Sequence, residues 1–265
     1  MNKAINYFDA SKVDFNLKEL SRIAQSAIVN EGYVIFRNFP IDLENIEKIK
    51  AEFLQLSTLI GEPISHDANN SIIWDIKMNN SSSNLIKTYS EHSHEAELHT
   101  DSQYSFYPED MFGLLSLVKA KCGGGLSLLL SLEDIIIHLN ALPNGKEIIE
   151  ILSNTDFPFI VPNVFKQNEN KEQEFNYGPI LRKNEIRFRI DTFEKSLRFS
   201  DNICTEAQLN AYRELKKIVT NKKLISNLFL EPGDLLFINN KTMLHGREEF
   251  EDSDRHLLRI RMNNY

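Results

Sequence analysis

Short apolar segments closed by Gly, Pro, Asn or Ser follow one another from about residue 64 to the end of the chain. Segments of this length and spacing are typical of β-strands, because they are too short for stable helices. We predict strands over 111–118, 126–130, 157–161, 185–192 and 235–238, after an earlier one at 33–36. Apolar residues at helical spacing predict helices over 17–29, 43–59, 132–142, 146–152 and 206–219.

This order of elements predicts a mainly β fold with flanking helices. A β-sandwich or jelly roll that carries an α-helical N-terminal layer accommodates many short strands and a few helices. We find no internal repeat and no clear linker, so residues 1–265 are expected to form a single domain. The pattern does not indicate an oligomeric state.

The charge and composition favour a small-molecule substrate. The net charge is −8 and the basic residues form no long runs, which argues against nucleic acid or an anionic membrane as a partner. No apolar run is long enough to span a membrane, and the N-terminus lacks the apolar core of a signal peptide, so we expect a cytoplasmic protein. Two cysteines, in no zinc-binding spacing, are expected to be free thiols.

A histidine and an aspartate two residues apart, His99 and Asp101, form the most informative motif. In an extended segment both side chains point to the same face. A second imidazole would complete the 2-His-1-carboxylate triad, which holds Fe(II) and leaves coordination positions open. The best-placed second histidine is His245, which follows the predicted strand at 235–238. The pair alone is a weak signal, so its surroundings must decide.

The C-terminal strand alternates in charge. Arg255, Arg259 and Arg261 share one face with Leu257, and the opposite face is mostly apolar. If the apolar face packs against helices, the arginines line the interior, where an anionic ligand would offset the cost of burying them. The alternative is an edge strand whose arginines face solvent.

Three segments in order resemble the Fe(II)/2-oxoglutarate-dependent oxygenases of the taurine dioxygenase and clavaminate synthase-like type. They are Leu98-His99-Thr100-Asp101-Ser102, Gly123-Gly124-Gly125-Leu126-Ser127, and Leu244-His245-Gly246-Arg247 with Asp254-Arg255-His256-Leu257-Leu258-Arg259. The resemblance implies a double-stranded β-helix, or jelly roll, in which His99, Asp101 and His245 are the catalytic metal ligands. It also implies Fe(II), 2-oxoglutarate as co-substrate, and O2.

The same resemblance implies further roles. Arg255 best matches the family's arginine that clamps the distal carboxylate of the 2-oxoglutarate co-substrate, with Arg259 as second candidate because the preceding loop is short. Ser127 matches the hydroxyl residue that contacts the same co-substrate. Gln103, Arg189 and Asp191 are candidate substrate-binding residues, and a carboxylate such as Asp191 could hold an amino group. For the last two, the alternative is a local surface ion pair.

We therefore expect hydroxylation of an unactivated C–H bond in a free amino acid or an amino-acid-derived metabolite, with release of succinate and CO2. Desaturation or ring formation remains open within the same family. The rivals are a non-catalytic jelly-roll module that binds a metabolite and, less favoured, a zinc hydrolase. The polar tract 79–84 is a candidate lid, and His92 with His94 is a weak candidate for a second metal site.

Overall fold

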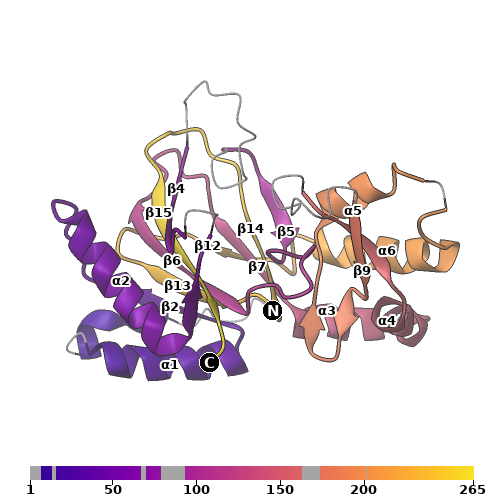
Figure 1. Ribbon diagram of the computed structural model, residues 1–265, viewed down its shortest axis with the longest axis horizontal. Coiled ribbons are helices and arrows are strands. Elements are labelled where there is room, and N and C mark those ends of the chain that lie inside the picture. The colour runs from indigo at the N-terminus through magenta and orange to yellow at the C-terminus, as the bar shows by residue number, and fades with distance from the viewer. Residues whose placement is uncertain (1–6, 14–15, 67–69, 79–92, 163–173, 201) are drawn as a thin grey trace.

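Two β-sheets face one another at the centre of the molecule (Figure 1). The computed structural model describes residues 7–13, 16–66, 70–78, 93–162, 174–200 and 202–265. The seven-stranded sheet has the order β1-β2-β13-β6-β15-β3, with β4 also paired to β15, and the four-stranded sheet has the order β12-β7-β14-β5. Most neighbouring strands are antiparallel and far apart in sequence, so each sheet is assembled from both halves of the chain.

The strands of the seven-stranded sheet are β1 (Tyr7–Asp9), β2 (Tyr33–Arg37), β3 (Glu62–Ile64), β4 (Ile73–Lys77), β6 (Met111–Val118), β13 (Leu235–Asn239) and β15 (His256–Asn263). Those of the four-stranded sheet are β5 (Ala96–His99), β7 (Ser127–Ser131), β12 (Ser226–Leu228) and β14 (Met243–Arg247). Two small hairpins pair β8 (Phe157–Ile160) with β9 (Phe175–Gly178) and β10 (Leu181–Arg182) with β11 (Glu185–Ile186).

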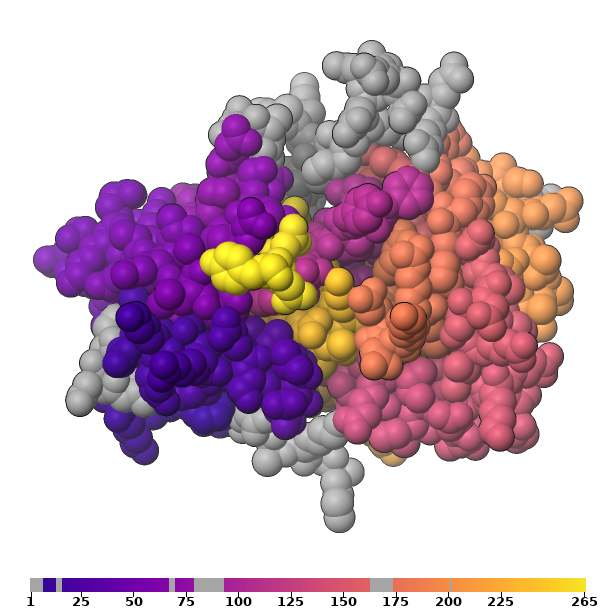
Figure 2. Space-filling model, turned by 60° about the horizontal axis from the view of Figure 1, so that its bottom comes forward, coloured from indigo at the N-terminus to yellow at the C-terminus, as the bar shows by residue number. Residues whose placement is uncertain are grey.

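Helices cover the outer face of each sheet. A short 3₁₀ turn, η1 (Ala10–Val13), precedes α1 (Leu17–Asn30) and α2 (Ile46–Ile60), which pack on the seven-stranded sheet. The other group packs on the four-stranded sheet and comprises α3 (Leu132–Asn140), α4 (Gly145–Asn154), α5 (Ile190–Ser196) and α6 (Glu206–Val219). Figure 2 shows the two groups on opposite sides, with C-terminal strand segments between them. No helix of the described residues is long and apolar enough to cross a membrane.

Alternation along the strands divides the core into three clusters. On β15, Leu258, Ile260 and Met262 pack with α1 and α2. Leu257, on the opposite face, packs between the two sheets with residues such as Leu129 of β7. The arginines of this strand share that inner face, so the prediction of an interior cationic face is confirmed. The solvent-exposed edge strand is excluded, because β15 lies between β6 and β3.

The expected balance of elements needs correction, because the fold is mixed α/β rather than mainly β. Among the described residues, about as many lie in helices as in strands. The cause is the segment between β7 and β12, whose four helices build a separate apolar cluster on the outer face of the four-stranded sheet. The periodic pattern predicted three of these helices but missed α5 (Ile190–Ser196), and it did not indicate the size of the layer that the four form together.

One predicted strand, 185–192, is wrong. Its first two residues form β11, but Ile190 begins α5 and Asp191 lies in the first turn of that helix. Polar and apolar residues alternate from Arg187 to Ile190 as they do in a strand. The reason is that the backbone before α5 is extended and lies beside His99. The other predicted helices and strands are found within a few residues of their expected ends.

The capping box of α6 offers a test of this helical layer. The Thr205 hydroxyl accepts a hydrogen bond from the Gln208 backbone N–H, and the Gln208 side chain accepts one from the Thr205 N–H. Thr205→Ala is expected to lower the free energy of unfolding by about 1 kcal/mol, whereas Thr205→Ser retains the cap. Urea denaturation of both variants measures this, and equal losses in the two would contradict the role of the cap.

Candidate active site

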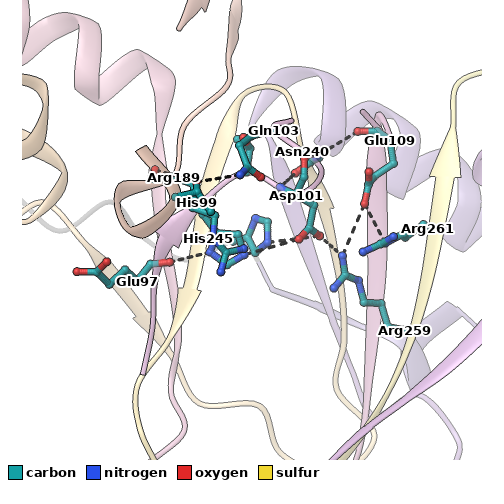
Figure 3. Close-up of polar contacts among 12 residues, drawn as sticks. Glu97, His99, Asp101, Gln103, Glu109, Arg189, Asn240, His245, Arg259 and Arg261 are labelled. Atoms are coloured by element: carbon teal, nitrogen blue, oxygen red, sulfur yellow. Dashed lines mark hydrogen bonds and ion pairs between the residues drawn. The ribbon is translucent and has the colours of Figure 1, made fainter. Parts of the chain in front are cut away.

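The two histidines of the predicted triad meet across neighbouring strands. His99 ends β5 and pairs in register with His245 of β14, so both rings lie on the same face of the sheet, 4.4 Å apart between centroids. Asp101 follows two residues later, with Oδ1 3.6 Å from the His99 Nε2 and Oδ2 3.6 Å from the His245 Nε2. One ligand atom from each residue lies within 4.8 Å of the others. The structure thus brings the whole predicted triad together (Figure 3).

Both imidazoles are prepared to act as metal ligands. The Nδ1 of His99 lies 2.7 Å from the carbonyl oxygen of Glu97, and since a carbonyl only accepts, Nδ1 carries the proton and Nε2 keeps its lone pair. Burial lowers the pKa of His99 well below its usual range and that of His245 to about 3. Neutral histidines and one carboxylate are the donor set that suits Fe(II), so the residues fit this ion.

A buried arginine approaches the carboxylate of the triad from the other sheet. Arg259 of β15 donates to the Oδ2 of Asp101, and its Nη2 lies 3.8 Å from Glu109. The same Glu109 oxygen lies 2.9 Å from the Nε of Arg261. Glu109 is 3% exposed, so it is a buried counter-ion between two arginines of one strand (Figure 3).

The backbone of Asp101 is held by a side chain from the turn between β13 and β14. The Asn240 Oδ1 accepts from the N–H of Asp101 at 2.8 Å, and its Nδ2 donates to the carbonyls of Asp101 at 3.3 Å and Glu109 at 2.9 Å. Sequence reasoning missed both Asn240 and Glu109. The only signal was their position, five residues before His245 and eight after Asp101, which by itself indicates no role.

Arg255 lies just before β15, away from Asp101. Its side chain is buried against Phe250, whose ring centre is 5.2 Å from the guanidinium carbon. A Cβ on Gly125 would lie 3.1 Å from the Arg255 Nε, so the glycine segment that leads into Ser127 passes directly beside this arginine. Burial lowers the pKa of Arg255 to about 10, which leaves it cationic at neutral pH. The nearby Asp252 carboxylate partly offsets this shift, whereas the neighbouring Arg247 adds to it.

Ser127 begins β7 and is buried on the same inner face as Leu129, which pairs with His245. The predicted co-substrate residues therefore separate into two places. Arg255 and Ser127 lie near the glycine segment, and Arg259 lies at the triad.

The candidate substrate residues lie beside His99. Arg189 forms a β-bridge with His99, and its Nε donates to the Asp191 Oδ1 at 2.7 Å. The local ion pair is therefore present, although Asp191 reaches it from α5 and not from a strand. Gln103 is buried, and its Nε2 donates to the Thr192 hydroxyl at 2.9 Å, so this side chain ties the loop after the triad to α5.

Two sequence-based candidates are not tested. Residues 79–84 and His92 lie outside the described part of the chain. The backbone carbonyl of His94 accepts a hydrogen bond from Arg247, and within the described residues the only metal-ligand cluster found is the triad.

The family of the chain follows from its match to a family model. The model of the family described as taurine catabolism dioxygenase TauD, TfdA family, matches residues 3–261. The chain belongs to the TauD/TfdA family. With the triad assembled, this TauD/TfdA-family protein is an Fe(II)- and 2-oxoglutarate-dependent dioxygenase.

Solved structures agree with the fold. An asparagine oxygenase in complex with Fe(II), 3-hydroxyasparagine and succinate superposes with a TM-score of 0.73 at 18% identity, covering 92% of this chain and 79% of that one. The non-heme iron oxygenase OrfP, in complex with Fe, succinate and a dihydroxy-arginine, gives 0.73 at 18% identity, with 94% and 80% covered. No curated protein matches the sequence significantly.

Proposed function

We propose that this dioxygenase hydroxylates an unactivated C–H bond of a free amino acid or an amino-acid-derived metabolite. The observation that carries the proposal is the Arg189–Asp191 pair beside His99, at the edge of the triad. A guanidinium and a carboxylate side by side complement the carboxylate and ammonium groups of an amino acid. The asparagine oxygenase and OrfP, which share the fold, are described in complexes with hydroxylated amino acids.

We further propose that the two sheets are the halves of a double-stranded β-helix and that residues 1–265 form one domain. The apolar cluster between the sheets and the triad on the same inner face support this assignment. A cavity of about 440 Å³ adjoins Asp101 between the loop 106–108 and the hairpin of β10 and β11. Its size lies within the range of small-molecule pockets.

Two of the three candidate residues are proposed to hold the co-substrate. Arg255 is assigned to the distal carboxylate of the 2-oxoglutarate molecule, because a buried guanidinium is stabilised by an anion that forms two parallel hydrogen bonds with it. Ser127 would donate its hydroxyl to the same carboxylate. Arg259 would stay at the triad, where its contact with Asp101 holds the carboxylate in one orientation.

When bound, Fe(II) and 2-oxoglutarate supply the oxidising chemistry, in which O2 is consumed, succinate and CO2 are released, and one oxygen atom enters the substrate. The protein contributes position and environment. His99 and His245 present neutral nitrogens from adjacent strands, and the buried inner face excludes bulk water from the reaction.

Anaerobic titration of metal-free protein with Fe(II) and then 2-oxoglutarate tests the reaction class. We expect the visible charge-transfer band of a bidentate 2-oxoacid chelate. A screen of free amino acids for stimulated succinate release then tests the substrate class. Stimulation by no amino acid, with the chelate band present, would reject a free amino acid as the substrate and leave the oxygenase assignment intact, and a second screen with N-acylated and peptide-linked amino acids would then test the amino-acid-derived class.

Substitution of Asp191 tests the substrate contact. Asp191→Asn removes a negative charge beside Arg189, and loss of one charge-assisted hydrogen bond of about 1.5–3 kcal/mol corresponds to a roughly 10–100-fold rise in the KM for the amino acid. The KM for the co-substrate should stay unchanged. Glu194→Gln is the matched control, since Glu194 lies in the same helix but pairs with Lys216. Equal KM values in Asp191→Asn and wild type would contradict the assignment.

A further inference from the structure

We propose that Asn240 is a positioning residue for the iron site, which holds both ends of the segment 101–109 and so sets the direction of the Asp101 carboxylate. This inference rests on the assignment of Asp101 as a metal ligand. Asn240 is not a metal ligand in this assignment, although it lines the cavity beside Asp101. It acts on the iron site through the backbone of Asp101, which is the ligand.

The contacts of Asn240 are unusually complete for one short side chain. It is 1% exposed, and its amide makes three hydrogen bonds, all to backbone groups of Asp101 and Glu109. Its own backbone N–H donates to the carbonyl of Asp110 at 2.9 Å. A buried amide satisfied in this way is costly to replace, because each backbone group left without a partner costs about 1–3 kcal/mol.

The segment between these two ends needs an external partner. Residues 100–110 form turns and bends without regular strand or helix pairing. Ser102, directly after the ligand, has a φ of 49°, a left-handed conformation that costs a non-glycine residue about 1–2 kcal/mol. Asn240 binds both backbone polar groups of the residue before this strained position. Fixing the N–H and the carbonyl of Asp101 fixes the direction of its Cα–Cβ bond.

Contacts at the other end of the segment 101–109 also reach the Asp101 carboxylate. Asn240 holds the carbonyl of Glu109, and the Glu109 side chain lies against Arg261 and Arg259. Arg259 in turn donates to Asp101. Asp101 is therefore held in two ways (Figure 3). Asn240 binds its backbone directly. Arg259 binds its carboxylate, and Asn240 also holds the backbone of Glu109, the counter-ion of that arginine.

The residue type matters as much as the position. An amide offers one acceptor to the N–H of Asp101 and donors to two carbonyls, whereas an ionised aspartate offers acceptors only. Asn240→Asp keeps the size and shape of the side chain, but turns two donor contacts into contacts between a carboxylate and carbonyl oxygens. The neighbouring Asn239 provides a matched control, because its amide bonds Ile28 and Lys241, away from the triad.

The test is anaerobic Fe(II) titration of the metal-free forms of wild type, Asn240→Asp, Asn240→Ala and Asn239→Ala, with the Tm of each metal-free form measured alongside. We expect the Kd for Fe(II) to rise about 10–100-fold in both Asn240 variants, the usual effect of losing a partner that orients a ligand, and to stay within about twofold of wild type in Asn239→Ala. The titrations are done well below the lowest Tm of the four proteins. If Asn240→Ala does not fold, the Kd of Asn240→Asp for Fe(II) tests the proposal on its own.

A folded Asn240 variant that binds Fe(II) as wild type does overturns the proposal, even if its Tm falls, because the residue would then be structural only. A wild-type protein that binds no Fe(II) would instead reject the metal site itself. The chelate band adds a second readout: its position should shift in Asn240→Asp if the carboxylate has turned, and should be unchanged in Asn239→Ala.

Discussion

Asp101→Ala is expected to abolish substrate-dependent succinate release and to weaken Fe(II) binding by more than the roughly 100-fold that loss of an orienting partner can cause. The physical reason is double. The substitution removes one of three ligand groups within 4.8 Å and also removes the anion to which Arg259 donates. Only the two neutral imidazoles then remain as ligands, and the Arg259 guanidinium, left with Glu109 alone as its counter-ion at 3.8 Å, repels the cation. Anaerobic titration with Fe(II), followed by 2-oxoglutarate, measures both losses.

Asp110→Ala is the matched control for this experiment. Asp110 lies at the end of the same loop and pairs with Lys241 at 2.6 Å, so its loss disturbs the loop without removing a ligand. We expect it to bind Fe(II) nearly as wild type does. Retention of iron and activity in Asp101→Ala would show that the histidine pair binds metal with a different third ligand.

Arg255→Ala is expected to raise the Kd for 2-oxoglutarate about 100-fold and to leave Fe(II) binding unchanged. The magnitude follows from about 3 kcal/mol for a charge-assisted contact with a carboxylate. The independence from iron follows from position, since Arg255 and Arg259 are four residues apart along one extended segment, roughly 13 Å along its axis. Titration of the Fe(II)-loaded variant with 2-oxoglutarate gives the Kd directly.

The comparison with Arg259→Ala separates the two candidate arginines. Because Arg259 donates to Asp101, its loss is expected to weaken Fe(II) binding as well. If Arg259→Ala lost 2-oxoglutarate while Arg255→Ala bound it normally, the two assignments would have to be exchanged. Arg255→Lys should recover little affinity, since an ammonium cannot make the paired contacts of a guanidinium.

Elements with a strong periodic pattern were predictable from sequence. The strand 111–118 and the helix 206–219 appear with the predicted ends, because a continuous apolar run and a capping box are local signals. The stretch 185–192 was misread because an extended connection alternates as a strand does. The size of the helical layer also escaped prediction, since it depends on how four helices share one core.

The residues of the candidate site were predictable where they belong to short sequence motifs. His99 and Asp101 are two residues apart, and the order of the remaining motifs pointed to His245. Asn240 was not predictable, because its partners Asp101 and Glu109 lie 139 and 131 residues away in the chain. A contact between residues so far apart produces no periodic pattern in the sequence. It can be recognised only once the structure shows that β5 pairs with β14.

The iron ligands and the arginines belong to different sheets. His99 and His245 are carried by the four-stranded sheet, and Arg255 and Arg259 belong to the C-terminal segment of the seven-stranded sheet. Under the proposed assignment of Arg255, the metal and the guanidinium that binds the co-substrate are carried by sheets that pack roughly 10 Å apart. Under the same proposal, side chains such as Leu129 and Leu257, which pack between the sheets, would help to set the length of the dicarboxylic acid that the site accepts.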